Sequence, residues 1–160
     1  MHLVRVRVRN FRGIAYGEVH LDGHTAFIGD NNAGKSTLLE AVDLVLGPER
    51  LNRRPVIDEH DFYAGTYVDP AKNEVVPIQV EVIVAGLSDE QLRHFRDHIE
   101  WWDTQTKALL VGAPPEGTDA PHVRAAIRVF FNGWYDVDED DFAGDTYYAT
   151  PDMPDGSYPR

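Results

Sequence analysis

Residues 29–36 read GDNNAGKS and fit G-x-x-x-x-G-K-[ST], the pattern of a phosphate-binding loop. A short apolar run, residues 24–28, precedes the motif and predicts a strand. Residues 35–46 follow with a helical pattern of Leu, Ala and Val, and apolar residues cover most of the circumference, so a largely buried helix is expected. Gly47-Pro48 ends that helix, because proline cannot continue one. This strand–loop–helix order constrains the fold more than any other feature of the chain.

The chemistry of the motif points to a nucleoside triphosphate. Gly29 and Gly34 allow a tight turn whose N–H groups face inward, where they and the helix N-terminus attract phosphate oxygens. Lys35 adds a positive charge for the β- and γ-phosphates and is the expected catalytic residue, while the Ser36 hydroxyl is expected to ligate Mg²⁺. ATP and Mg²⁺ are therefore the predicted cofactors. The predicted contacts are Gly29, Asp30, Asn31, Asn32, Ala33, Gly34, Lys35, Ser36 and Thr37.

Length and charge limit the class of protein. A chain of 160 residues suits one domain or one lobe of a larger protein, and the absence of cysteine excludes disulfides and fits a cytoplasmic location. No apolar run reaches the roughly 18 residues that span a bilayer, so no membrane association is expected. Residues 1–55 carry a net charge of +2 and residues 56–160 a net charge of −14. This acidity argues against broad, non-specific DNA binding by this chain alone.

The remaining pattern is mainly that of strands. Residues 3–9 alternate between valine and arginine, which predicts a half-buried strand, and residues 14–21 predict a second one. Ser88 and Gln91 form a capping-box pattern for a helix that runs to about Ile99. Further strands are expected at residues 78–84, 107–111, 123–131 and 146–149, with an irregular tail at residues 151–160.

Two stretches resemble a known family. Residues 4–13 (VRVRVRNFRG) and 29–37 (GDNNAGKST) are similar to the N-terminal lobe of ABC-type ATPases such as the RecF and SMC families. The Asn31-Asn32 pair, with IDEHDFYAG at 57–65 and HIEWWD at 98–103, most resembles the OLD (overcoming lysogenization defect) family of ATP-dependent endonucleases.

The resemblance implies a fold and a mode of action. It implies an α/β fold, that of a P-loop NTPase of the ABC type, in which this lobe combines a mixed sheet with an antiparallel β subdomain. It places Asn10, Phe11 and Arg12 near the base and ribose of the nucleotide. It also implies a head-to-head homodimer closed by ATP, and DNA as a partner of the parent protein through a later nuclease domain.

Two elements of such an ATPase do not appear in the sequence. No apolar run ends in the Asp-Glu pair of a Walker B strand. The stretch 87–91 (LSDEQ) superficially resembles the LSGGQ signature, but Asp89 and Glu90 would repel a γ-phosphate, and a helix cap explains them better. We therefore expect residues 1–160 to be part of an ATPase domain that is cut before its catalytic half, and to bind nucleotide with slow hydrolysis or none.

Other clusters have both functional and structural interpretations, and the structural one is favoured for each. Asp136, Asp138, Asp140 and Asp141 resemble a calcium loop or a nuclease D-x-D but fit an acidic turn better. His94 and His98 lie one helical turn apart without a third metal ligand, and Trp101-Trp102 suit packing of a helix end against the sheet.

The remaining candidates concern DNA and nucleotide. The stripe Arg5, Arg7 and Arg9 and the cluster Arg50, Arg53 and Arg54 could contact DNA phosphates, although a solvated or salt-bridged face is favoured. His60 and Asp61 could approach the nucleotide. Three alternatives stay open for the whole protein: a repair ATPase without a nuclease, a small P-loop kinase, and a non-hydrolysing binding module. The sequence also leaves open whether the process is DNA repair or phage defence.

Overall fold

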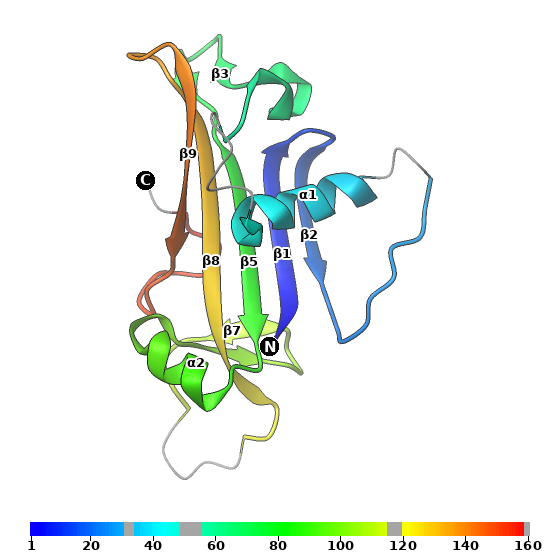
Figure 1. Ribbon diagram of the computed structural model, residues 1–160, viewed down its shortest axis with the longest axis vertical. Coiled ribbons are helices and arrows are strands. Elements are labelled where there is room, and N and C mark those ends of the chain that lie inside the picture. Colours follow the sequence, from blue (N-terminus) through cyan, green and yellow to red (C-terminus); the bar gives the residue numbers. More distant parts are fainter. Residues whose placement is uncertain (31–33, 49–55, 115–119, 159–160) are drawn as a thin grey trace.

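An antiparallel sheet of seven strands organises the computed structural model, which describes residues 1–30, 34–48, 56–114 and 120–158. The strand order is β2-β1-β5-β8-β6-β7, and β9 also pairs with β8 (Figure 1). The strands are β1 (His2–Phe11), β2 (Ile14–His20), β5 (Ile78–Ala85), β6 (Glu100–Asp103), β7 (Ala108–Leu110), β8 (Val123–Asp136) and β9 (Asp141–Tyr148), with a separate pair β3 (Val68–Asp69) and β4 (Glu74–Val75). The helices are α1 (Lys35–Leu46), α2 (Asp89–His94) and the 3₁₀ turns η2 (Glu59–Asp61), η3 (Tyr63–Gly65) and η4 (Arg96–His98).

One face of the sheet packs against α1 and forms the main core (Figure 1). Val6 and Val8 of β1 meet Leu38, Ala41 and Val45 of the helix there. The helix covers the residues that the sequence predicted, but it is buried on one face only. Leu39 is 61% exposed and Leu46 44% exposed, because no described element packs on the outer side of the helix. The expectation of a largely buried helix is therefore wrong for the chain as it stands.

The opposite face of the sheet carries buried charge instead of a continuous apolar layer. Arg5 donates two hydrogen bonds to Glu81, and Arg128 donates two to Glu100, at 2.8–3.2 Å. All four side chains are at least nine-tenths buried. A bulge at Val4 turns that valine onto this face, where it joins a small second core with Trp102. The expected alternation of β1 thus holds for Val6 and Val8 but fails at Val4.

The tail, predicted to be irregular, lies across this charged face. Backbone carbonyls of Met153 and Pro154 accept hydrogen bonds from Arg128. The Asp155 carboxylate accepts hydrogen bonds from Arg5 at 2.5 and 3.0 Å and from Arg7 at 2.7 Å. The tail has no helix or strand among its described residues, yet these contacts fix it to two strands, β1 and β8.

The Asp155 anchor is expected to weaken in acid. Burial alone would raise the pKa of Asp155, but the hydrogen bonds from Arg5 and Arg7 outweigh it and lower that pKa to about 2. The folded-state pKa lies below the unfolded value of 3.8. The contribution of the ionised Asp155 carboxylate to the free energy of unfolding is therefore complete above pH 3.8 and is lost as the pH falls towards 2. Asp155→Asn should lower the free energy of unfolding by about 1 kcal/mol at neutral pH, after allowance for partial exposure, and by much less in strong acid.

Urea denaturation at pH 7 and in strong acid measures this difference. Asp97→Asn serves as the control, because Asp97 is an exposed carboxylate on η4 whose ion pair with Arg96 is also exposed. An equal loss of stability from Asp155→Asn at both pH values would contradict the claim that the ionised Asp155 carboxylate holds the tail to Arg5 and Arg7.

Three sequence-based expectations are corrected by the sheet. Residues 24–28 form no strand; residues 22–30 form an irregular segment that follows β2 and leads towards α1 (Figure 1). Every pairing among the described strands is antiparallel, so the mixed sheet is not observed. Trp101 and Trp102, expected at a helix end, belong to β6, which lies between β7 and β8.

Candidate functional site

The glycine that precedes α1 has a left-handed backbone, which a loop turning into a helix requires. Gly34 has φ 76° and ψ 8°, a conformation that glycine adopts without steric cost. Its carbonyl accepts the first helical hydrogen bond, from the Leu38 N–H at 2.9 Å. The helix therefore begins at Lys35, immediately after the loop. Asn31, Asn32 and Ala33, three of the predicted phosphate contacts, lie outside the described residues.

The Lys35 side chain folds back over the start of the loop. Its ammonium group donates hydrogen bonds to the carbonyl oxygen of Gly29 and, at 2.5 Å, to that of Asp30. No ion pair joins it to a carboxylate within the part of the chain that the structure describes. The one positive charge of the motif is thus held by neutral oxygens, which are weaker partners for an ammonium group than phosphate oxygens are.

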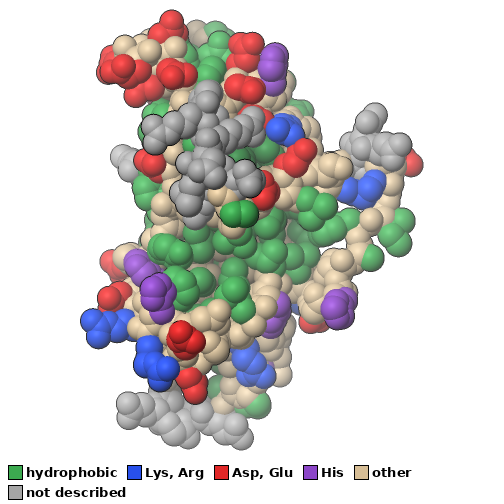
Figure 2. Space-filling model, in the orientation of Figure 1, with side chains coloured by type: hydrophobic (Ala, Val, Ile, Leu, Met, Phe, Trp, Pro, Cys, Tyr) green, Lys and Arg blue, Asp and Glu red, His purple; other side chains and the backbone are tan. Residues whose placement is uncertain are grey.

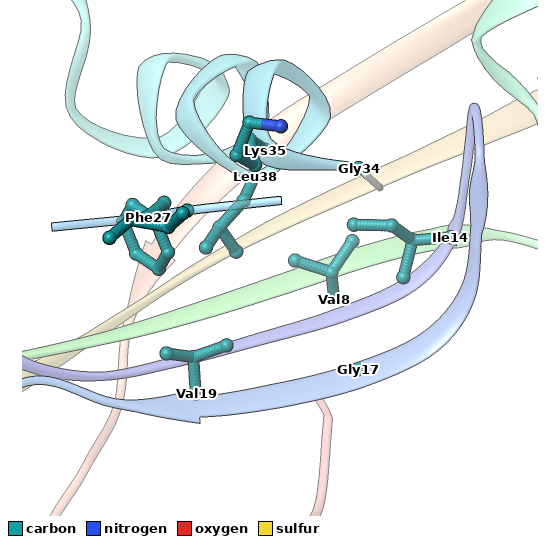
Figure 3. A pocket seen from close by; sticks show the side chains of 9 residues that line it. Val8, Ile14, Gly17, Val19, Phe27, Gly34, Lys35 and Leu38 are labelled. Carbon is teal, nitrogen blue, oxygen red and sulfur yellow. The ribbon is translucent and has the colours of Figure 1, made fainter. Parts of the chain in front are cut away.

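An apolar pocket of about 210 Å³ lies beside this lysine, between the first turn of α1 and the β1–β2 hairpin (Figure 3). Val8, Ile14 and Val19 line the sheet side, and Phe27 and Leu38 lie opposite them. Among the described residues that line it, Lys35 is the one that carries a charge. The pocket therefore suits apolar groups, and an anion is better matched to the loop above it.

The hydroxyl residues of the motif lie on the first turn of α1. Ser36 is exposed and Thr37 is half-buried. The β1–β2 turn lies close to Thr37: a Cβ atom added at Gly13 would be 3.9 Å from the Thr37 Oγ1 atom. A larger residue than glycine at position 13 would therefore approach the helix start.

The three residues expected near the base and ribose are engaged by the protein itself. The Asn10 amide donates to the carbonyls of Thr66 and Val76, at 2.9 and 3.0 Å, and Phe11 is 1% exposed in the main core. Arg12 makes an ion pair with Glu40 of α1. Their predicted contacts with nucleotide stay a prediction.

Arg12 joins the β1–β2 turn to both α1 and η2. Besides Glu40, it donates from Nε to the buried Asp61 carboxylate at 2.8 Å, and its backbone N–H donates to the Asp61 carbonyl at 2.8 Å. Burial would lower the pKa of Arg12, but the hydrogen bond and charge of Asp61 outweigh it and raise that pKa. Asp61 thus has a structural partner, while the neighbouring His60 is exposed. The part played by Glu40 had no signal in the sequence, because it depends on how the turn folds onto the helix.

The remaining sequence candidates have structural contacts. Arg5 and Arg7 are ion-paired as described above, and the Arg9 guanidinium lies 5.5 and 5.6 Å from the ring centroids of Tyr16 and Tyr158. Arg50, Arg53 and Arg54 lie outside the described residues.

The histidine and tryptophan pairs are also held by neighbouring groups. The His98 ring nitrogen is 2.9 Å from the Ala149 carbonyl oxygen, and the His94 ring packs edge-on against Phe95. Trp102 is buried in the second core, and Trp101 pairs with Leu110 across β6 and β7.

The acidic candidates form the tight turn between β8 and β9. The Asp136 carboxylate accepts hydrogen bonds from the backbone of Asp138 and Glu139, and Asp140 accepts one from the Tyr135 hydroxyl. The described residues contain no group of three or more His, Asp or Glu side chains that could hold a metal ion. Among the described helices, none is long and apolar enough to cross a bilayer.

Comparison with known proteins places this geometry in a family. A model of the AAA ATPase domain family matches residues 1–109. The OLD nuclease of Thermus scotoductus is 49% identical over 45 residues, which is 28% of this chain and 8% of that protein. The Old nuclease of Escherichia phage P2 is 30% identical over 92 residues, 58% of this chain and 13% of that protein. The matches thus cover a small part of either relative's length. They confirm the resemblance to the ATPase domain of OLD proteins, and the chain belongs to the AAA ATPase domain family.

Proposed function

We propose that residues 29–37 bind the triphosphate of ATP, with Mg²⁺ at the Ser36 hydroxyl. The observation that carries the proposal is the position of Lys35, whose ammonium group lies against the backbone of Gly29 and Asp30 at the start of α1. A helix N-terminus, a left-handed glycine and a lysine without a described carboxylate partner together suit a bound polyphosphate. The family match, which includes all of these residues, supports the same conclusion.

We further propose that the chain is the ATP-binding lobe, of the ABC type, of a longer ATP-dependent endonuclease. The small share of each OLD relative that it matches supports this, and so does the exposed apolar surface around the loop. Ile28 is 95% exposed and Leu39 of α1 is 61% exposed, and hydrophobic side chains gather over the region of α1 in Figure 2. Such a surface is typical of a face that another layer of protein covers. In the whole protein, ATP would hold two lobes together and thereby gate DNA processing.

Calorimetric titration of nucleotides into the chain tests the phosphate site. ATP with Mg²⁺ should bind more tightly than AMP, and adenosine least tightly, because the predicted contacts are to phosphates. We expect little turnover in a phosphate-release assay, since the sequence offers neither a Walker B strand nor a signature. Binding of adenosine as tight as that of ATP would contradict the phosphate site. Robust hydrolysis would contradict the proposal that this chain lacks the catalytic half of the ATPase.

A further inference from the structure

A second pocket, of about 470 Å³, opens on the face of the sheet opposite α1. Val75, Pro77, Asn132, Trp134 and Tyr147 line it. Alternation along β8 explains this location, because Phe131 points into the α1 core and its neighbour Asn132 must point the other way. The other lining side chains are aromatic or aliphatic. The Asn132 amide is a polar group among them, and its position in β8 directs it to this face.

That amide lacks a partner for its acceptor atom. The Asn132 Oδ1 atom is buried, and the described residues supply no hydrogen bond to it. A buried acceptor without a donor is unfavourable, so a ligand that brings an N–H group would relieve the defect. In this orientation of the amide the missing group is a donor, which argues against a carboxylate or phosphate as the occupant.

The surroundings of the pocket are acidic. Asp145 is the cross-strand partner of Asn132 and accepts a hydrogen bond from the Tyr147 hydroxyl at 3.4 Å. Glu74 precedes the lining residue Val75, and acidic side chains gather at the tip of the β8–β9 hairpin (Figure 2). Arg9 is at the same register position as Asn132 but two strands away, because both pair with Gln79, and this separation is about 10 Å. Its guanidinium lies over two tyrosine rings. A cation is therefore favoured over a nucleic-acid backbone.

We propose that this pocket binds an arginine side chain presented by a partner protein. A planar guanidinium can stack on Trp134 or Tyr147 while donating N–H bonds to the Asn132 oxygen, a combination that ammonium groups match less well. The positive charge would be attracted by Asp145 and by the acidic second part of the chain. This site is on the other side of the sheet from the phosphate-binding loop and does not depend on it.

Titration with short peptides, followed by ¹⁵N NMR, tests the proposal. The probe is acetyl-Gly-Arg-Gly-amide, with the citrulline peptide as its neutral counterpart of equal shape and the lysine peptide as a second comparison. The arginine peptide should shift the indole signal of Trp134 and the side-chain amide signals of Asn132, with a dissociation constant on the order of millimolar for one anchoring residue. The citrulline peptide should bind about tenfold more weakly, because the charge is lost.

Variants separate the pocket from other surfaces. Asn132→Leu should weaken binding about tenfold by removing the acceptor, and Asn132→Asp should tighten it. Tyr63→Leu, which alters an exposed tyrosine outside the pocket, should leave it unchanged. Equal binding of the arginine and citrulline peptides would overturn the proposal. So would the absence of shifts at Trp134, or a stronger response of these signals to deoxycytidine, which would assign the pocket to a nucleobase.

Discussion

Lys35→Ala is expected to weaken ATP binding by about ten- to a hundredfold, since a charge-assisted hydrogen bond to phosphate contributes roughly 1.5–3 kcal/mol. The wild-type ammonium group already lies at the loop, against Gly29 and Asp30, so little rearrangement is needed to reach a phosphate. Alanine also favours the helix, and the folded state of α1 should survive the change. Calorimetry with Mg·ATP measures the effect directly.

Two controls accompany this substitution: a variant of a lysine outside the motif, and a nucleotide without the terminal phosphates. Lys72→Ala removes an exposed lysine near β3 and β4, and it should leave ATP affinity unchanged. AMP has neither β- nor γ-phosphate, so its affinity should fall much less in Lys35→Ala than that of ATP. An unchanged ATP affinity, or an equal loss for both nucleotides, would show that the lysine does not contact the terminal phosphates.

Arg128→Met is expected to lower the free energy of unfolding by about 3–5 kcal/mol, the typical effect of leaving a buried charge without its partner. The Arg128 side chain is fully buried, donates two hydrogen bonds to Glu100, and holds the carbonyls of Met153 and Pro154. Without it, Glu100 keeps its burial but loses its counterion. Burial already raises the pKa of Glu100, despite the opposing hydrogen bond from Arg128, so removal of the arginine should favour the protonated carboxyl.

Chemical denaturation of two further variants tests this explanation. The double variant Arg128→Met with Glu100→Gln removes both charges, and it should recover a substantial part of the lost stability. Arg96→Met alters an arginine whose side chain is 79% exposed and should change stability by no more than about 0.5 kcal/mol. If the double variant were as unstable as Arg128→Met alone, loss of packing and not an unpaired charge would be the cause.

The sequence by itself determined the elements whose signals are local. Its pattern predicted α1 at the residues that the structure gives, Lys35–Leu46, because helical periodicity and the following Gly47-Pro48 lie within a few turns of one another. The capping box of Ser88 and Gln91 is confirmed for the same reason, with both reciprocal hydrogen bonds formed. The glycines, lysine and hydroxyl of the phosphate motif also act over eight neighbouring residues, so the candidate site could be recognised without a structure.

Tertiary structure decided what depends on distant partners. A strand exists only beside another strand, so residues 24–28 form none, while Trp101 and Trp102 become part of β6 between two neighbours. The ion pair between Arg5 and Glu81 joins residues 76 positions apart, and Asp155 reaches Arg5 across 150 positions. Alternating arginines on a strand predict a polar face. Whether water or carboxylates from elsewhere in the chain meet that face is decided only when the strands assemble.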